Sequence, residues 1–251
     1  MDNEKRPRRN CVGGAFVTYF TRVRYYDSMR ICFVTDGGLN DFAENSTAAA
    51  DVVCFSLQAL GKVSYERELK GETSLFEDVA LLSKELSNVV VCGCYTDARG
   101  VHRKSVVVAE RGRILGVSDM VNRIDSNEYR CGAGIKIFDT SAGKIGIVVA
   151  EDLYFPQVMQ TLSVCGAEIA LCVFEELSEG LEGTLMRAEA FLYGIPVCVC
   201  AYGYAMISDI AGKLRFASPK TPCCFDLERE QEYHLVETRL RGFARRRKTG
   251  F

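Results

Sequence analysis

The chain has 251 residues, of which 48% are hydrophobic and 25% are charged. This composition is typical of a soluble globular protein with one large domain. The formal net charge of −2 gives no overall attraction to nucleic acid or anionic membranes, and no apolar run reaches the roughly 18 residues of a membrane-spanning helix. The chain has only two histidines, His102 and His234, which are too few for most histidine-based metal sites and leave little choice for a Ser-His-Asp triad. We therefore expect no metal and no cofactor.

Cysteine is abundant, with twelve residues, yet no two cysteines have the CxxC spacing of zinc, thioredoxin or haem-attachment motifs. Several lie inside apolar β-like runs, such as Val91–Cys94 and Val197–Cys200. Thiols in such runs usually behave as small buried hydrophobes. We therefore expect a reduced, cytoplasmic protein without a disulfide framework.

The N-terminal basic cluster Lys5–Arg9 precedes a short apolar stretch, but that stretch contains two glycines and runs into further arginines. This favours an extension over a signal peptide. We expect residues 1–28 to be an N-terminal extension or to precede the true translation start at Met29. Residues 29–243 would then form the domain, followed by a basic tail at residues 244–251.

From Met29 onward, strand-like runs alternate with amphipathic segments, which predicts an α/β layered domain. The predicted strands are residues 31–35, 51–55, 89–94, 105–110, 114–118, 135–138, 145–149, 169–174 and 196–201. Helical periodicity is clearest over residues 74–87, 156–164 and 184–193. The pairs Arg111-Gly112, Ala142-Gly143 and Gly212-Lys213 are typical of hairpin turns, so the sheets should be mixed.

One segment, Gly146–Gln157, reads as a buried strand that ends at Ala150, followed by Glu-Asp and a Phe-Pro pair that opens a helix. It resembles the nucleophile elbow of the nitrilase, or carbon–nitrogen hydrolase, superfamily. In family order, further pieces resemble that family: Ala50–Phe55, the hairpin at Gly112–Gly116, the segment Glu128–Gly134, Cys165–Ile169 and Arg187–Ala190. The resemblance covers about residues 30–243.

The resemblance implies a four-layer α-β-β-α sandwich with mixed sheets, of a kind that commonly dimerises. We therefore expect a homodimer or a larger oligomer. The segment between the first two strands is short for the family, so the first helix should be a stub.

Members of this family hydrolyse nonpeptide carbon–nitrogen bonds with a glutamate, a lysine and a cysteine. Carried over residue by residue, these positions fall on Leu57, Met120 and Ala150. Small register shifts do not restore them: there is no Glu between Asp51 and Tyr65, no Lys between Ser105 and Ile135, and no Cys between Lys144 and Val164. If only one of the two charged residues were replaced, the other would remain as a buried charge without a partner, which is costly. Replacement of both the glutamate and the lysine by apolar residues avoids this cost.

Four residues remain candidates for a pocket. Glu128 matches a second glutamate that many relatives hold near the nucleophile, or it is an exposed loop carboxylate. Glu151 and Asp152 follow the elbow and could form a polar rim or complement the dipole of the next helix. Cys172 is a nearby thiol by topology, or simply a buried core cysteine.

The favoured interpretation is a non-catalytic protein with this fold that binds a small molecule or a partner. One alternative is an active hydrolase of amide, nitrile or carbamoyl compounds that uses relocated residues such as Cys172 or Glu128. A second alternative is nucleic-acid association through the basic ends, which would show as steep salt dependence; we do not expect nucleic acid as the main partner.

Overall fold

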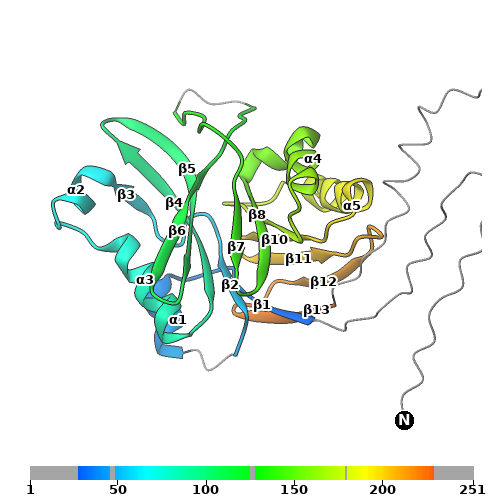
Figure 1. Cartoon of the computed structure of the whole chain (residues 1–251), viewed down its shortest axis with the longest axis horizontal. Coiled ribbons are helices and arrows are strands. Elements are labelled where there is room, and N and C mark those ends of the chain that lie inside the picture. The colour runs from blue at the N-terminus through cyan, green and yellow to red at the C-terminus, as the bar shows by residue number, and fades with distance from the viewer. Residues whose placement is uncertain (1–27, 46–48, 125–127, 179, 229–251) are drawn as a thin grey trace, which may run out of the picture.

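A computed structural model describes residues 28–45, 49–124, 128–178 and 180–228. Figure 1 shows two β-sheets packed face to face, with helices on the outer side of each. The predicted extension, apart from Ser28, lies outside the described residues, as do the basic tail and His234.

The first sheet has seven strands in the order β13-β1-β2-β4-β5-β6, with β3 paired to β4. The chain enters it through parallel strands β1, β2 and β4, and then turns through two antiparallel hairpins into β5 and β6. The strands are β1 (Ser28–Val34), β2 (Val52–Phe55), β3 (Lys62–Ser64), β4 (Val89–Ala98), β5 (Val101–Glu110), β6 (Arg113–Asp119) and β13 (Cys223–Glu228).

The second sheet has six strands in the order β12-β11-β10-β9-β8-β7. Its centre, β8, β9 and β10, is parallel, and its two flanks are antiparallel, so this sheet is mixed as predicted. The strands are β7 (Ile137–Thr140), β8 (Gly143–Val149), β9 (Ile169–Val173), β10 (Val197–Ala201), β11 (Tyr204–Ser208) and β12 (Leu214–Ser218).

Helices cover both outer faces, which completes the four layers (Figure 1). Helix α3 contacts β4, β5 and β6, whereas α5 contacts β10 and β11 and packs against α4. The elements are α1 (Leu39–Asn45), α2 (Tyr65–Leu69), α3 (Leu75–Glu85), the 3₁₀ helix η1 (Ala150–Tyr154), α4 (Pro156–Val164) and α5 (Leu181–Tyr193). Pro156 is the first residue of α4, where a backbone N–H would have no partner within the helix, so its absence costs no hydrogen bond.

The main core lies between the two sheets and beneath α4 and α5, and a second apolar cluster lies between the first sheet and helices α1 and α3. Every residue of β2, β9 and β10 is buried. Burial on both faces explains why these strands are continuous apolar runs without alternation.

The α/β, four-layer α-β-β-α prediction is confirmed, and a strand is present at each of the nine predicted places. The first helix is the expected stub of seven residues. Four strands, β3, β11, β12 and β13, were not predicted; of the predicted turns, Gly212-Lys213 proves to connect β11 with β12.

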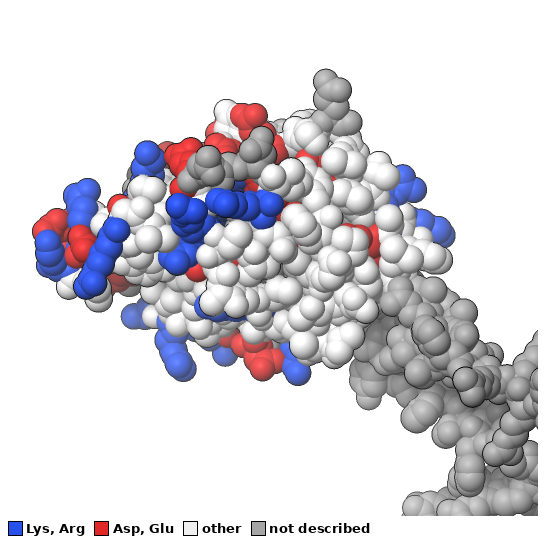
Figure 2. Space-filling view, turned by 90° about the horizontal axis from the view of Figure 1, so that it is seen from above, with Lys and Arg blue, Asp and Glu red and all other residues white. Residues whose placement is uncertain are grey.

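In the described parts of the chain, no helix is both long enough and apolar enough to cross a membrane. Seen from above, Lys, Arg, Asp and Glu side chains lie mainly at the left, the top and the margins of this face, around a wide area with few charged groups (Figure 2).

Candidate functional site

The segment that follows β8 has the shape of an elbow. The strand ends at Val149, Ala150 adopts a left-handed backbone with φ of 47°, and η1 and α4 follow at once. A non-glycine residue in this conformation is uncommon, and the strain is usually retained where the surrounding structure or a function requires it. Ala150 is buried, with 3% of its surface exposed. The strained turn therefore holds a methyl group at the position where the resemblance implies a nucleophile.

Leu57 and Met120, at the two other positions that the resemblance marks, lie in the same buried cluster as Ala150. Leu57 follows β2, and its N–H donates to the carbonyl of Phe174 at 2.9 Å. The chain passes so close to β4 here that a Cβ on Gly93 would lie 2.2 Å from the Cα of Leu57. Leu57 and Met120 are 0% and 2% exposed, so both side chains pack in the core.

A pocket of about 310 Å³ opens beside Ala150, at the carboxyl ends of β8 and β9. Its lining is mainly polar, with four glutamates and one lysine, and it contains neither cysteine nor histidine. The lining residues are Lys104, Ala150, Glu151, Tyr154, Phe174, Glu175, Glu176, Ser178 and Glu182.

Lys104 is a pocket residue that the sequence did not point to. It lies on β5, and its carbonyl accepts the N–H of Met120, so the two residues are neighbours across the β5–β6 pair. Its Nζ lies 2.6 Å from Glu151 Oε1 and 5.7 Å from the centre of the Tyr129 ring. The site thus has a lysine close to Ala150, although it comes from a different strand.

Glu182, near the start of α5, also lines the pocket. Its Oε1 accepts hydrogen bonds from the hydroxyl of Tyr154 and from the backbone N–H and hydroxyl of Ser178. Burial alone would raise the pKa of Glu182, but these donors hold it below its usual value. Burial, together with Glu182, raises the pKa of Tyr154 to about 12, so the phenol keeps its proton and Glu182 is ionised at neutral pH.

Of the predicted pocket residues, Glu151 lines the pocket and Asp152 does not. Asp152 is 3% exposed and accepts bonds from the N–H groups of Val121 and Asn122 and from the Asn122 side chain, at 2.7 to 3.1 Å. Burial raises the pKa of Asp152 to about 6 in spite of these donors. It ties the elbow to the segment that carries Met120.

Glu128 and Cys172 lie elsewhere. Glu128 is exposed and borders a separate hollow of about 220 Å³, together with Tyr95, Tyr129 and His102. Cys172 is fully buried in β9, and burial raises the pKa of its thiol well above the ordinary value. A thiol in that state is protonated at neutral pH and is a poor nucleophile.

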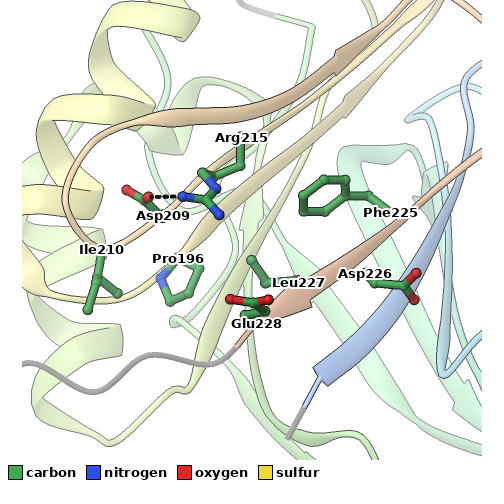
Figure 3. Close-up of a pocket in the computed structure, with 8 residues that line it drawn as sticks. All are labelled: Pro196, Asp209, Ile210, Arg215, Phe225, Asp226, Leu227 and Glu228. Carbon is green, nitrogen blue, oxygen red and sulfur yellow. Dashed lines mark ion pairs between the residues drawn. The ribbon is translucent and has the colours of Figure 1, made fainter. Parts of the chain in front are cut away.

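Another pocket, of about 160 Å³, lies at the far end of the sandwich, where Pro196 leads into β10 (Figure 3). Figure 3 shows Arg215 paired with Asp209 across its wall, at 3.5 Å. Because Ala150 follows the carboxyl end of β8, which runs parallel to β9 and β10, this pocket is separate from the one beside the elbow. Across the described residues, no three His, Cys, Asp or Glu side chains are grouped to hold a metal ion.

No family model matches the sequence. The sequence is similar to a probable nitrilase of Schizosaccharomyces pombe, with 24% identity over 41% of this chain and 40% of that protein. It is also similar to an N-carbamoylputrescine amidase of Solanum tuberosum, with 28% identity over 35% of this chain and 32% of that protein. These matches span less than half the length of either relative.

Solved structures give a more extensive match. A mutant of the Nesterenkonia AN1 amidase from the nitrilase superfamily covers 88% of this chain and 97% of its own, with a TM-score of 0.70 and 15% identity. Nit3 of Saccharomyces cerevisiae, from branch 10 of that superfamily, covers 89% of this chain and 97% of its own, with a TM-score of 0.68 and 15% identity. This chain has the fold of the nitrilase, or carbon–nitrogen hydrolase, superfamily, and the predicted resemblance is confirmed.

Proposed function

We propose that this protein binds a small molecule in the pocket beside Ala150 without hydrolysing it. The observation that carries the proposal is the elbow itself: a left-handed backbone is kept at Ala150, yet the side chain there has no nucleophilic atom. In a glutamate-to-glutamine mutant of the similar Nesterenkonia sp. AN1 amidase, by contrast, acrylamide adds to the active-site cysteine. A strained turn around an open pocket is consistent with a binding site that has been kept without the bond-forming group.

The apolar residues behind the pocket support the same proposal. Leu57 and Met120 are buried in the core with Ala150, so they supply no proton carrier and no cation to the cavity. Without a nucleophile, a charged glutamate or lysine at these buried positions would cost free energy and contribute nothing to chemistry. Their absence is therefore expected for a protein that binds and does not react.

The test is a screen of small amides, nitriles, carbamoyl compounds and amines against the full-length chain, by ligand-observed NMR. We expect at least one compound to bind, to stay intact during prolonged incubation, and to lose binding in Ser178→Phe, which places a ring over the pocket. Ser141→Phe, on a loop outside the pocket lining, is the matched control and should bind normally. Slow breakdown of a bound compound, or binding that survives Ser178→Phe in a folded variant, would contradict the proposal.

A second candidate is an active hydrolase with relocated residues, and one observation favours it. Lys104 and Glu151 put a lysine and a glutamate back beside Ala150, only 2.6 Å apart. In such an enzyme, Glu151 would deprotonate a water molecule and Lys104 would stabilise the oxyanion. This candidate predicts turnover that disappears in Glu151→Gln, and it fails if no compound in the panel is hydrolysed.

A further inference from the structure

Two buried carboxylate oxygens in the pocket have no hydrogen-bond donor among the described residues. Glu182 is only 1% exposed; its Oε1 is fully used, whereas its Oε2 has no partner. Glu151 repeats the pattern, because Oε1 bonds to Lys104 while Oε2 is buried without a partner. Buried polar atoms in folded proteins almost always have partners, so each of these oxygens indicates a missing donor.

The charge of the pocket wall points to the kind of donor that is missing. Four glutamates line the pocket against one lysine, and that lysine is already bonded to Glu151. The hydrogen bonds from Tyr154 and Ser178 keep Glu182 ionised, so its negative charge persists at neutral pH. An anionic ligand would be repelled here, whereas a cation with several N–H groups would satisfy both charge and hydrogen bonding.

The shape of the site favours an organic cation over an inorganic one. In the part of the chain that the structure describes, the carboxylates are not grouped closely enough to coordinate a metal ion. An adjoining hollow of about 550 Å³ shares Glu176, Ser178 and Glu182 with the pocket. Its other walls are largely apolar or aromatic, formed by Leu177, Tyr202, Tyr204 and Met206 together with two glycines.

Aromatic rings also lie on the wall of the pocket itself. Tyr154 and Phe174 lie in edge-to-face contact, with ring centres 6.5 Å apart, and both line the cavity. A cation is attracted to the face of such rings when it is removed from water. The acidic wall and the rings together match a positively charged head group joined to an apolar body.

We propose that the pocket beside Ala150 selects organic cations, an ammonium or guanidinium group carried on an apolar chain or ring, with Glu182 as the main anchor. This inference rests on the proposed ligand-binding function and names the chemical class of its ligand. Glu151 contributes its free oxygen, and Lys104 holds Glu151 in place.

The experiment compares three probes of nearly the same shape by calorimetric titration of the full-length chain near pH 7 and at low salt: benzylammonium, benzamide and benzoate. A charge-assisted hydrogen bond to a buried carboxylate predicts that benzylammonium binds about tenfold more tightly than benzamide and that benzoate binds most weakly. Glu182→Gln keeps the acceptor for Tyr154 and Ser178 but removes the charge. It should weaken benzylammonium about tenfold and leave benzamide unchanged.

Glu77→Gln makes the same change on the exposed face of α3 and should alter nothing. If Glu182→Gln does not fold, the exposed Glu176→Gln provides the same comparison with a smaller expected loss. The inference is overturned if benzamide or benzoate binds as tightly as benzylammonium, if none of the three binds, or if both pocket variants bind benzylammonium normally. Preference for benzamide or benzoate would leave ligand binding intact, whereas release of ammonia from benzamide would overturn the proposed function itself.

Discussion

Lys104 and Glu151 form a pair that is largely shielded from water, with side chains 14% and 28% exposed. Replacing Lys104 with Met would leave Glu151 without its cationic donor. We expect Lys104→Met to lower the free energy of unfolding by about 1–3 kcal/mol, which urea denaturation measures.

The double variant Lys104→Met with Glu151→Gln removes both charges and should recover part of that loss. A coupling of more than about 0.5 kcal/mol in this cycle supports the pairing. Additive effects of the two substitutions would show that the pair has no energetic role.

Glu189, on the inner face of α5, is 3% exposed, and neither of its carboxylate oxygens has a hydrogen-bond partner among the described residues. Burial raises its pKa from 4.5 to about 7. The folded state therefore holds the proton more tightly than the unfolded state, and its stabilising contribution is complete below about pH 4.5 and is lost as the pH rises through 7.

Glu189→Gln should remove this pH dependence. Relative to the original chain, we expect the variant to be equally stable near pH 4 and more stable by up to about 3 kcal/mol above pH 8, measured by denaturation across that range. The control is Glu77→Gln, which should not change the profile. A constant difference at all pH values would rule out titration of Glu189 as the cause.

The site residues show what single positions in a sequence can and cannot reveal. Glu151 was found because it follows the elbow directly, and Asp152 was found with it although it serves the backbone of residues 121 and 122. The sequence does not point to Lys104, because this residue lies just before the segment from Ser105 to Ile135 in which the resemblance places the lysine. Lys104 and Met120 become neighbours only when β5 pairs with β6, so the antiparallel register is the signal that could have found it.

At the level of elements, the backbone of the turn between β5 and β6 is strained at Arg111. Arg111 and Gly112 both have positive φ, 48° and 86°, and Glu110 pairs directly with Arg113. This is the geometry of a two-residue hairpin that favours Asn-Gly. We expect Arg111→Asn to raise the free energy of unfolding by about 0.5–1 kcal/mol, measured in urea.

Arg113→Asn is the matched comparison, because Arg113 is exposed and lies within β6. Asparagine is unfavourable in a strand, so this variant should be slightly less stable. Equal effects at both positions would mean that the backbone conformation at Arg111 is not strained.

Most strands that the sequence predicted share a physical property; the edge strands β6 and β7, with one buried residue each, do not. Strands β2, β4, β8, β9 and β10 are apolar runs buried on both faces or nearly so, and their composition alone marks them. Among the missed strands, β11 is an exception with four buried residues, whereas β3, β12 and β13 have one buried residue each. Such strands exist because a neighbouring strand provides hydrogen-bond partners, and that partner is invisible in a local pattern.

At the scale of the whole molecule, the outer surface of the α4 and α5 layer carries large apolar side chains. Val164, Leu181 and Phe191 are 80%, 51% and 48% exposed. Together with the family resemblance, this supports the expected homodimer, with this layer at the interface. Sedimentation velocity should show a species of twice the chain mass, and Phe191→Glu should shift it towards the monomer, whereas Leu69→Glu on α2 should not. A monomer at all concentrations would contradict the prediction.

The elbow at Ala150 lies beside the pocket, and the proposed function requires that the pocket bind a small molecule without reacting with it. The most direct test measures ammonia release from amides, nitriles and carbamoyl compounds by the purified full-length chain, alongside Glu151→Gln and Lys104→Met. We expect no release above the background of heat-denatured protein for any compound. Turnover by the unaltered chain that is lost in either variant would contradict it and would establish an enzyme with relocated residues.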